Sequence, residues 1–432
     1  MSIANPLNPE NPLDTQDQRD LELQGVRMLK RAAVQESIAE IAAHWREAIY
    51  KSIPGPMQPA LEQRFDESLE QVIFHGVVAG LNLDAGHPKV HSTPHWEHRI
   101  NGVRIPGTMG GIPNPDAVYR FIPVDGEASF LVKGKFPKRQ PLINEYSLVT
   151  KDFKTVGNIS AAELKVSADG SFTITIDPKP ANGRINHLQT TPDAVQLLIR
   201  EMMADWSQEK SAFFEVERTG GAPVGSPKTD DELEPIVCQS LQKYVKDFIW
   251  ASKLCLDKPA NTLQSPEIYR GDASTGGFLV TQAYSMGRFF LEKGEALILS
   301  VELGGATYIV APLSDYWSVT RDFTKHTVSY NITQATPDPD GSYSFVVAVE
   351  DPGVANWLDP EGVNEGLIFF RWAGFDPKRM AEANPRIATK VVKVSELAKN
   401  LPSGSPRADA AVRREQLAQR ARDYAWRRKY RA

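Results

Sequence analysis

The chain opens with apolar residues that recur every three or four positions between residues 18 and 52, the spacing of an amphipathic helix. A proline- and glycine-rich run over residues 52–56 ends this pattern. A second helical pattern follows over residues 61–73, so we expect a helical region over residues 1–90 that packs on another part of the molecule. The apolar positions are Leu23, Val26, Val34, Ile38, Ile41, Trp45 and Ile49, then Leu61, Phe65, Leu69, Val72 and Ile73.

From about residue 86 the pattern changes to short runs of valine, isoleucine, phenylalanine and tyrosine, separated by prolines and glycines. This texture predicts short strands joined by turns. Asp169-Gly170 and Asp340-Gly341 each stand immediately before an apolar run. They indicate hairpin turns, because glycine accepts a positive φ.

Two stretches of the chain repeat each other. Tyr119-Arg120-Phe121 matches Gly287-Arg288-Phe289, and residues 145–153, 169–172 and 186–189 match residues 315–323, 340–343 and 356–359. The offset between matched blocks stays between 168 and 171 residues. Collinear matches at a nearly constant offset indicate an internal duplication, and therefore two domains of the same fold.

One segment carries two conflicting signals. Thr191 and Pro192 have the chemistry of a helix start, an N-cap threonine followed by proline at the first helical position. The repeat partner of this segment, residues 366–372, is short, aromatic and typical of a strand. We give the repeat more weight and predict a strand over residues 196–203.

Between the copies, residues 231–250 show a helical pattern, and Ser403-Gly404-Ser405-Pro406 separates a final segment. The predicted organisation is a helical region over 1–90, a first copy over 91–220, a helical linker over 221–265, a second copy over 266–402 and a tail over 403–432. Residues 407–432 hold nine Lys or Arg against three Asp or Glu, an excess of six positive charges.

The tail is expected to form a basic amphipathic helix with Val412, Leu417, Tyr424 and Trp426 available for docking. The whole chain carries −5, so the rest carries −5 − 6 = −11. We favour a helix packed on this acidic body or on a neighbouring subunit. A nucleic-acid arm is the weaker alternative, because no recognised nucleic-acid fold accompanies it.

Length and composition allow a large core, with 432 residues of which 41% are hydrophobic. The two cysteines, Cys238 and Cys255, fall in a segment with a helical pattern and argue against a disulfide framework. The first 16 residues are polar and proline-rich, unlike a signal peptide, and no apolar stretch reaches the ~18 residues of a membrane helix. We therefore expect a cytoplasmic protein.

The second copy carries a family resemblance. The motifs are residues 316–320 (YWSVT), 329–331 (SYN), 340–342 (DGS), 356–359 (NWLD) and 371–372 (RW). They resemble a mostly bacterial domain-of-unknown-function family, numbered twelve-fourteen, and Asn114-Pro115-Asp116 is similar to the opening of its longer members. Asp359 stands where the family often has proline, and Phe370-Arg371-Trp372 replaces the usual ending. The resemblance covers about residues 110–400, and it implies β-sandwich domains without implying a reaction.

The predicted fold class is mainly β with helical additions (α+β). It comprises two duplicated, jelly-roll-like β-sandwich domains, a helical N-terminal region and a basic helical C-terminal tail.

Four of the eight histidines fall within twelve residues, a density that raises the question of a metal site. Prolines interrupt the run and the H-E-x-x-H motif is absent, so we expect solvated loop histidines near a pocket mouth and no metal. The four are His87, His91, His95 and His98.

The duplication separates residues that serve the shared fold from residues that differ between copies. Arg120 with Arg288, and Asp152 with Asp322, are expected to hold strands or turns. In the last matched block, His187 and Gln189 are replaced by Trp357 and Asp359. Either Trp357 stacks on a ligand and Asp359 acts as an acceptor or base, or Trp357 fills the core and Asp359 caps a turn.

These patterns favour a small-molecule cleft at the junction of the sandwiches. There is no G-x-S-x-G elbow or Walker loop, and the glycines at 107, 110 and 111 do not stand between a strand and a helix. The first hypothesis is a lyase or hydrolase without an organic cofactor, acting on a small, partly apolar or sugar-like metabolite. The second is a non-catalytic ligand-binding or assembly module. Either is expected to be a homo-oligomer that binds neither nucleic acid nor membrane. Candidate catalytic residues are Asp359, His95 and Arg371, and candidate substrate-binding residues are Trp317, Asn331, Asn356, Trp357 and Tyr119.

Overall fold

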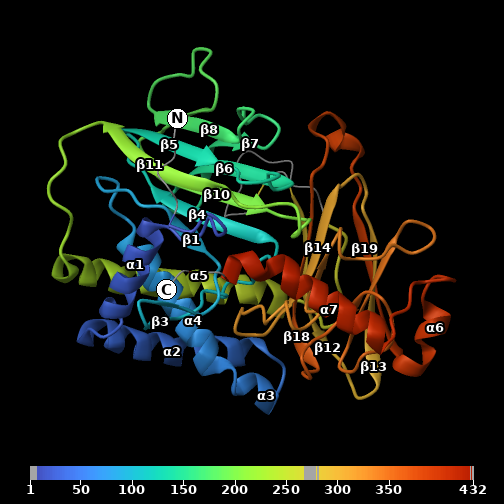
Figure 1. Ribbon diagram of the computed structural model, residues 1–432. Helices are drawn as coiled ribbons and strands as arrows, with labels where there is room; N and C mark the ends of the chain where they lie inside the picture. Colours follow the sequence, from blue (N-terminus) through green and yellow to red (C-terminus); the bar gives the residue numbers. More distant parts are fainter. Residues whose placement is uncertain (1–6, 267–278, 280–281, 429, 431–432) are drawn as a thin grey trace.

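The chain forms two β-sandwiches side by side, with a helical layer below the first and a C-terminal helix across the second (Figure 1). The computed structural model describes residues 7–266, 279, 282–428 and 430. This architecture confirms the predicted α+β fold with duplicated sandwiches and helical additions. Within the described residues, no helix is both long and apolar enough to cross a membrane.

The helical layer is built from the N-terminal region and the long helix that joins the two copies. Its helices are α1 (Gln16–Met28), α2 (Ala32–Ser52), α3 (Pro59–Glu62), α4 (Phe65–Leu81) and α5 (Asp230–Leu256). A capping box at Thr229 and Glu232 begins α5, which confirms the predicted linker helix. The single helical pattern over residues 18–52 is two helices. The chain turns at Lys30-Arg31, where the Arg31 guanidinium reaches Glu234 of α5 at 2.7 Å.

Both sandwiches have the same strand order. The first pairs β1-β4-β10-β6-β7 in one sheet and β11-β5-β8-β9 in the other. The second pairs β12-β18-β14-β15 and β19-β13-β16-β17, which is the same order without an equivalent of β1 among the described residues. In each copy the short last strand of the second sheet, β9 or β17, pairs parallel to its neighbour. The duplication seen in the sequence is therefore a duplication of the complete sandwich topology.

The strands of the first copy are β1 (His91–Thr93), β4 (Ala117–Pro123), β5 (Ser129–Lys135), β6 (Ile143–Thr150), β7 (Thr155–Ser160), β8 (Ser171–Asp177), β9 (His187–Gln189), β10 (Ala194–Met202) and β11 (Phe213–Gly220). Those of the second are β12 (Ala283–Phe290), β13 (Glu295–Glu302), β14 (Tyr308–Ser314), β15 (Ser329–Asn331), β16 (Tyr343–Ala348), β17 (Trp357–Leu358), β18 (Glu365–Ala373) and β19 (Arg386–Lys393). A small hairpin, β2 (His98–Ile100) and β3 (Val103–Ile105), lies between β1 and β4 in the chain.

The segment with conflicting signals is the strand β10, as the repeat predicts. It pairs along its length with β4 on one side and β6 on the other, at the centre of its sheet. Two ladders of hydrogen bonds outweigh the local helix-start chemistry of Thr191 and Pro192. The two Asp-Gly sequences form turns with a positive φ, 82° at Gly170 and 85° at Gly341. The prediction of hairpins is wrong, because the strands before and after each turn belong to different sheets.

The matched sequence blocks do not all occupy matching positions in the two sandwiches. Tyr146 lies inside β6, whereas its sequence partner Tyr316 follows the end of β14. In the second copy the chain leaves the sheet here, so that Tyr316 and Trp317 enter the core of the helical layer. The block match is correct in sequence, but packing against the helices has moved the second block out of the strand.

The central strand β18 separates two cores. Leu367 and Phe369 belong to the core shared with the helical layer, while Ile368, Phe370 and Trp372 fill the interior of the second sandwich. All nine residues of β18 are buried. A strand that is covered on both faces is a continuous apolar run, which explains the unbroken hydrophobicity of residues 367–370.

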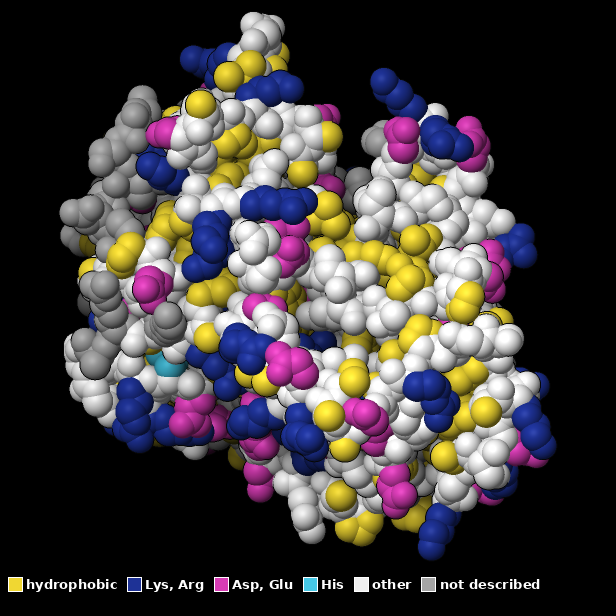
Figure 2. All heavy atoms as spheres, turned by 45° about the vertical axis from the view of Figure 1, so that its right-hand side comes forward, with side chains coloured by type: hydrophobic (Ala, Val, Ile, Leu, Met, Phe, Trp, Pro, Cys, Tyr) yellow, Lys and Arg dark blue, Asp and Glu magenta, His cyan; other side chains and the backbone are white. Residues whose placement is uncertain are grey.

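The tail forms the helix α7 (Ala410–Tyr424) and docks on the body of the protein, after a short helix α6 (Leu397–Asn400). Tyr424 and Trp426 are buried in a cluster that includes residues of both copies, while Val412 remains exposed. Figure 2 shows Lys and Arg interspersed with Asp and Glu on the face that it presents, so the basic excess of the tail does not create a single-sign patch on that face.

Candidate functional site

Of the residues proposed from the sequence to bind substrate, Trp317 lies in the core. Its indole is fully buried and makes edge-to-face contacts with Trp45 and Phe65, at centroid distances of 6.1 Å and 4.6 Å. Its Nε1 donates to the carbonyl of Leu61 at 2.7 Å. Trp317 therefore fastens the second sandwich to the helical layer.

Asn331 lies at the junction of the two copies, in a fully satisfied polar network. Its amide donates to the Asp116 carboxylate at 2.8 Å, and the same carboxylate accepts from Trp206 Nε1 at 2.8 Å and from the Tyr308 hydroxyl at 2.6 Å. Burial raises the pKa of Asp116, and these three hydrogen bonds oppose that rise. Asp116 belongs to the Asn-Pro-Asp motif, so in this protein the motif joins the first sandwich to the second.

The loop that differs between the copies is held by similar contacts in each. The Asn356 side chain bonds the backbone of Thr336 in both directions at 2.8 Å, and Asn186 does the same with Lys165 at 2.8 Å. Trp357 donates from Nε1 to the Ala348 carbonyl at 2.8 Å. Each asparagine thus fixes its own loop.

Asp359 forms an ion pair with His326, with 2.8 Å between Oδ2 and Nδ1, and also accepts from the Glu361 backbone at 2.8 Å. The hydrogen bond with Asp359 raises the pKa of His326. The geometry of Asp359 is that of a turn cap, the second of the two roles considered from the sequence.

His95 is buried in a cluster that the sequence does not reveal. Its Nε2 lies 3.0 Å from one carboxylate oxygen of Glu22 on α1, and His98 Nε2 lies 2.9 Å from the other. The side chains are 0–6% exposed. Burial raises the pKa of Glu22, but the two imidazoles outweigh burial and hold it below its ordinary range. These three groups could hold a metal ion.

The expectation of solvated histidines is wrong for this segment. His91 and His95 are 0% and 3% exposed, because α1 and α4 cover the segment. The side chain of His98 is 6% exposed, and only its backbone is more accessible. Burial lowers the pKa of His91 to about 3, so it is neutral at physiological pH. No local periodicity in residues 87–98 indicates this burial.

Two residues proposed from the sequence, Arg371 and Tyr119, line one cavity of about 170 Å³ between the sandwiches. The cavity is bounded by the first sheet of each copy, by α5 and by the loop at Gly111 and Ile112. The lining residues are Gly111, Ile112, Tyr119, Arg200, Met202, Trp250, Ala251, Leu254, Leu279, Gln282, Tyr284, Phe369 and Arg371.

Each copy contributes an arginine and a tyrosine to this cavity from corresponding strands. Arg200 of β10 lies opposite Tyr119 of β4, and Arg371 of β18 lies opposite Tyr284 of β12. Both arginines are buried, at 5% and 8% exposed. The repeated sheet therefore brings two guanidinium groups and two phenol rings to the same space.

The polar groups of the cavity are held in fixed positions. The Arg371 guanidinium donates to the carbonyls of Phe369 and Ile112 at 3.1 Å and 2.9 Å, and it stacks over the Phe369 ring at 4.3 Å. Burial lowers the pKa of Arg200, and burial raises the pKa of Tyr284 to about 12. Tyr284 is therefore a protonated hydroxyl at neutral pH, and its oxygen accepts from the Leu279 backbone at 3.0 Å.

The backbone that presents the Ile112 carbonyl is strained. Ile112 has φ 51°, a conformation that a β-branched residue rarely adopts. A side chain on the preceding Gly111 would collide with Phe248 at 2.5 Å, so the glycine-rich loop allows close approach to α5. Such strain costs about 1–3 kcal/mol, and here it points a carbonyl at Arg371.

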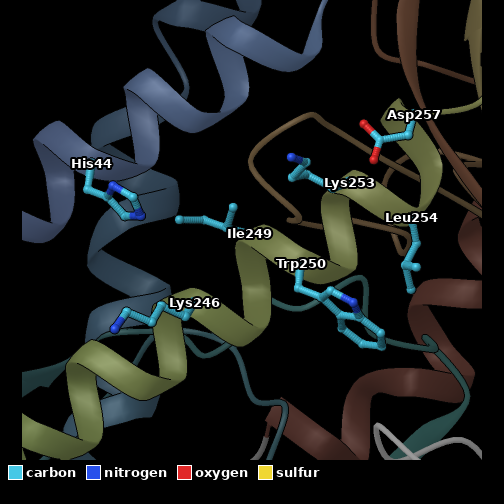
Figure 3. Close-up of a pocket in the computed structure, with 7 residues that line it drawn as sticks. All are labelled: His44, Lys246, Ile249, Trp250, Lys253, Leu254 and Asp257. Atoms are coloured by element: carbon cyan, nitrogen blue, oxygen red, sulfur yellow. The ribbon is translucent and has the colours of Figure 1, made fainter.

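A second, open hollow of about 400 Å³ lies on the outer side of α5. Figure 3 shows its lining, in which His44 comes from α2 and the others from α5 and its C-terminal cap. Trp250 and Leu254 line both this hollow and the inner cavity. These two side chains consequently form the wall between them.

Sequence patterns did not identify Arg200, Tyr284 or Trp250, which complete the cavity. One signal was present, because Arg200 and Arg371 each interrupt an apolar run at the corresponding strand of each copy. The cavity and the Asp359 loop do not share lining residues among those described, so the proposed site residues do not converge on one place.

A comparison with one solved structure agrees with the fold. A crystal structure of an uncharacterized protein from Burkholderia cenocepacia is similar, with a TM-score of 0.68, 22% sequence identity and coverage of 86% of this chain and 99% of that chain. The VPA0106 protein from Vibrio parahaemolyticus gives a TM-score of 0.42 at 12% identity, over 84% of this chain and 100% of that chain. No curated protein matches the sequence. The model of the family described as "Protein of unknown function (DUF1214)" matches residues 143–204, and this match confirms the family resemblance predicted from the sequence.

Proposed function

We propose that the cavity between the sandwiches binds a small carboxylate, or a similar planar anion, with an apolar body. The observation that carries the proposal is the guanidinium of Arg371. It lines the cavity, is 8% exposed, and bonds backbone carbonyls but no carboxylate among the described residues. A buried cation without a counter-ion is costly, and a bound anion offsets that cost. The planar fork of arginine suits a carboxylate in particular.

The size and lining of the cavity limit the ligand. An apolar cavity of about 150 Å³ holds benzene, so a cavity of about 170 Å³ suits a molecule the size of benzoate or a branched short-chain acid. Phe369, Met202 and Leu279 supply apolar surface to the cavity.

The chemistry of the lining favours binding over hydrolysis or elimination. A lyase or hydrolase needs a base or nucleophile within reach of the substrate. Among the described residues that line the cavity, none is an aspartate, glutamate, histidine, lysine, serine, threonine or cysteine, and of its two tyrosines Tyr284 stays protonated because burial raises its pKa to about 12. The proposal is therefore a ligand-binding module, the second of the two functions inferred from the sequence.

We expect benzoate to bind the purified protein in isothermal titration calorimetry, and benzamide, its neutral isostere, to bind at least about 10-fold more weakly. Arg371→Gln should weaken benzoate binding about 10- to 100-fold, because it removes a charged donor from a buried site.

Arg379→Gln is the matched control. Arg379 is also in the second copy, but it is exposed and pairs with Glu382 at 2.7 Å, so this variant should bind benzoate like the wild type. Equal binding of benzamide and benzoate, or unchanged benzoate affinity in Arg371→Gln, would show that the cavity does not recognise an anion. Absence of binding by benzoate and by short branched acids would reject the proposal.

A further inference from the structure

We propose that Glu22, His95 and His98 form a binding site for a divalent transition-metal ion of the zinc type. The three side chains come from α1 and from the segment around β1 and β2, and their ligand atoms all lie within 4.8 Å of one another. Two imidazole nitrogens and one carboxylate are a donor set that suits zinc and leaves one coordination position for water. The site is separate from the cavity between the sandwiches, since none of the three residues lines it.

The orientation of both histidine rings suits a metal ion. Nδ1 of His95 and Nδ1 of His98 lie 3.2 Å and 3.0 Å from the same oxygen, the carbonyl of Trp96. A carbonyl only accepts, so both Nδ1 atoms carry a proton, and both Nε2 atoms face Glu22. A metal-binding histidine typically donates its other ring N–H to a carbonyl in this way.

The distances between the histidine Nε2 atoms and the Glu22 oxygens are also close to those around a bound ion. The two Nε2 atoms lie 3.0 Å and 2.9 Å from the Glu22 oxygens. Ligand atoms around a tetrahedral ion with bonds of 2.0–2.1 Å stand roughly 3.3 Å apart. The two nitrogen–oxygen distances are therefore a few tenths of an ångström shorter than those around a bound ion, and no ligand atom of the set lies more than 4.8 Å from another. In the structure Nε2 of His95 makes no hydrogen bond of good geometry, although the residue is 3% exposed.

The surroundings fix these ligands in place. The Gln18 amide donates to a Glu22 oxygen at 2.7 Å, and Tyr430 stacks on the His98 ring at 3.7 Å with the planes 8° apart. The ring of Phe74 meets His95 edge-on at 6.4 Å. An ion bound here would join α1 to the segment around β1 and β2, and Tyr430 of the tail stacks on one of its ligands.

The test is the metal content of the full-length protein, purified without chelators from cells grown with added Zn²⁺ or Co²⁺. We expect about one ion per chain in the wild type, and less than about a tenth of an ion in Glu22→Gln and His98→Asn. His87→Asn is the control, because His87 lies in the same segment but pairs with Asp84 at 3.1 Å. This variant should keep its metal.

A second measurement needs no variant. X-ray absorption at the metal edge of the wild-type protein should show two imidazole nitrogens at ~2.0–2.1 Å. If the wild type holds no metal, or if Glu22→Gln and His98→Asn hold as much as the wild type, the three groups form only a buried ion-pair cluster and the proposal is wrong. If these variants fail to fold, a coordination shell without two imidazoles rejects it.

Discussion

The Asp359 carboxylate has the chemistry of a general base, but both of its oxygens already take part in contacts that hold its loop. One oxygen pairs with His326 and the other accepts from the backbone of Glu361, so both are occupied within the loop after β17. Arg371, in contrast, bonds only backbone carbonyls among the described residues and lines a cavity. At the scale of residues, a charged group that is already paired with an opposite charge makes a structural contact, whereas one that is bonded only to carbonyls beside a cavity indicates a binding site.

The His326–Asp359 pair predicts a pH-dependent stability. The pKa of His326 is raised above its ordinary value of about 6.5, so the pair stabilises the protein fully below that value and loses its effect as pH rises through the raised pKa. We expect the melting temperature of His326→Gln to fall below that of the wild type at pH 5, and the gap to close towards pH 9. In an Asp359→Asn background the gap at pH 5 should be smaller, because the hydrogen bond with Asp359 is the largest cause of the raised pKa of His326 while the charges of Glu361 and Asp322 remain. A gap that widens with pH would contradict the pairing.

At the scale of elements, α7 explains the basic tail. Arg413, Arg420 and Arg427 follow one another at intervals of seven residues, and all three are buried. Arg420 donates to the Phe323 carbonyl at 2.8 Å and lies over the Trp206 ring at 5.0 Å. Burial lowers its pKa to about 10. The positive charge of these residues is used for docking on carbonyls and aromatic rings of the protein itself.

This docking predicts that substitutions at buried and exposed positions of α7 lower the free energy of unfolding by different amounts. Arg420→Ala should lower the free energy of unfolding by about 2–4 kcal/mol, because it leaves the Phe323 carbonyl and the Gln334 amide oxygen without their donor. Arg414→Ala, at an exposed position of the same helix, should change it by less than about 0.5 kcal/mol. Urea unfolding measures both. Equal effects of the two substitutions would show that the tail does not dock through its buried face.

At the scale of the whole molecule, Asp116 joins the two copies. It belongs to the first copy, and it accepts from Tyr308 and Asn331 of the second copy and from Trp206 of the first. The tail contacts the same residue, because Arg427 donates to the backbone carbonyl of Asp116 at 2.9 Å. One buried carboxylate therefore helps to set the relative position of the sandwiches, and with it the shape of the cavity, together with the Arg371–Ile112 hydrogen bond.

We expect Asp116→Ala to lower the free energy of unfolding by about 3–5 kcal/mol, because three buried donors lose their acceptor. Asp152→Ala, at an exposed position of the first copy, is the control and should cost less than about 0.5 kcal/mol. Denaturant unfolding followed by tryptophan fluorescence gives both values. A cost below about 1 kcal/mol for Asp116→Ala would mean that other contacts hold the sandwiches together.

The sequence predicted much of the fold and little of the cavity, for a physical reason. Repeats and periodicity are local in the chain, so they identified β10 despite its helix-start residues, and they identified α5 and α7. The cavity combines residues from four strands, a helix and two non-regular segments, and no spacing in the chain relates Trp250 to Arg200. Glu22 was missed for the same reason, because only the tertiary fold brings α1 to His95. The sequence comparison singled out the loop in which the two copies differ. The cavity instead uses a feature that the copies share, because each copy contributes one arginine.

The burial of β18 on both faces has a consequence for the kinds of change that this chain tolerates. Alternate residues of the strand face different environments, so replacing Leu367 or Phe370 with another apolar residue alters one core only. Inserting or deleting a single residue would exchange the two faces along the rest of the strand. Arg371 would then point into the interior of the sandwich and Trp372 into the cavity. Related sequences should therefore vary in the composition of this strand while keeping its length.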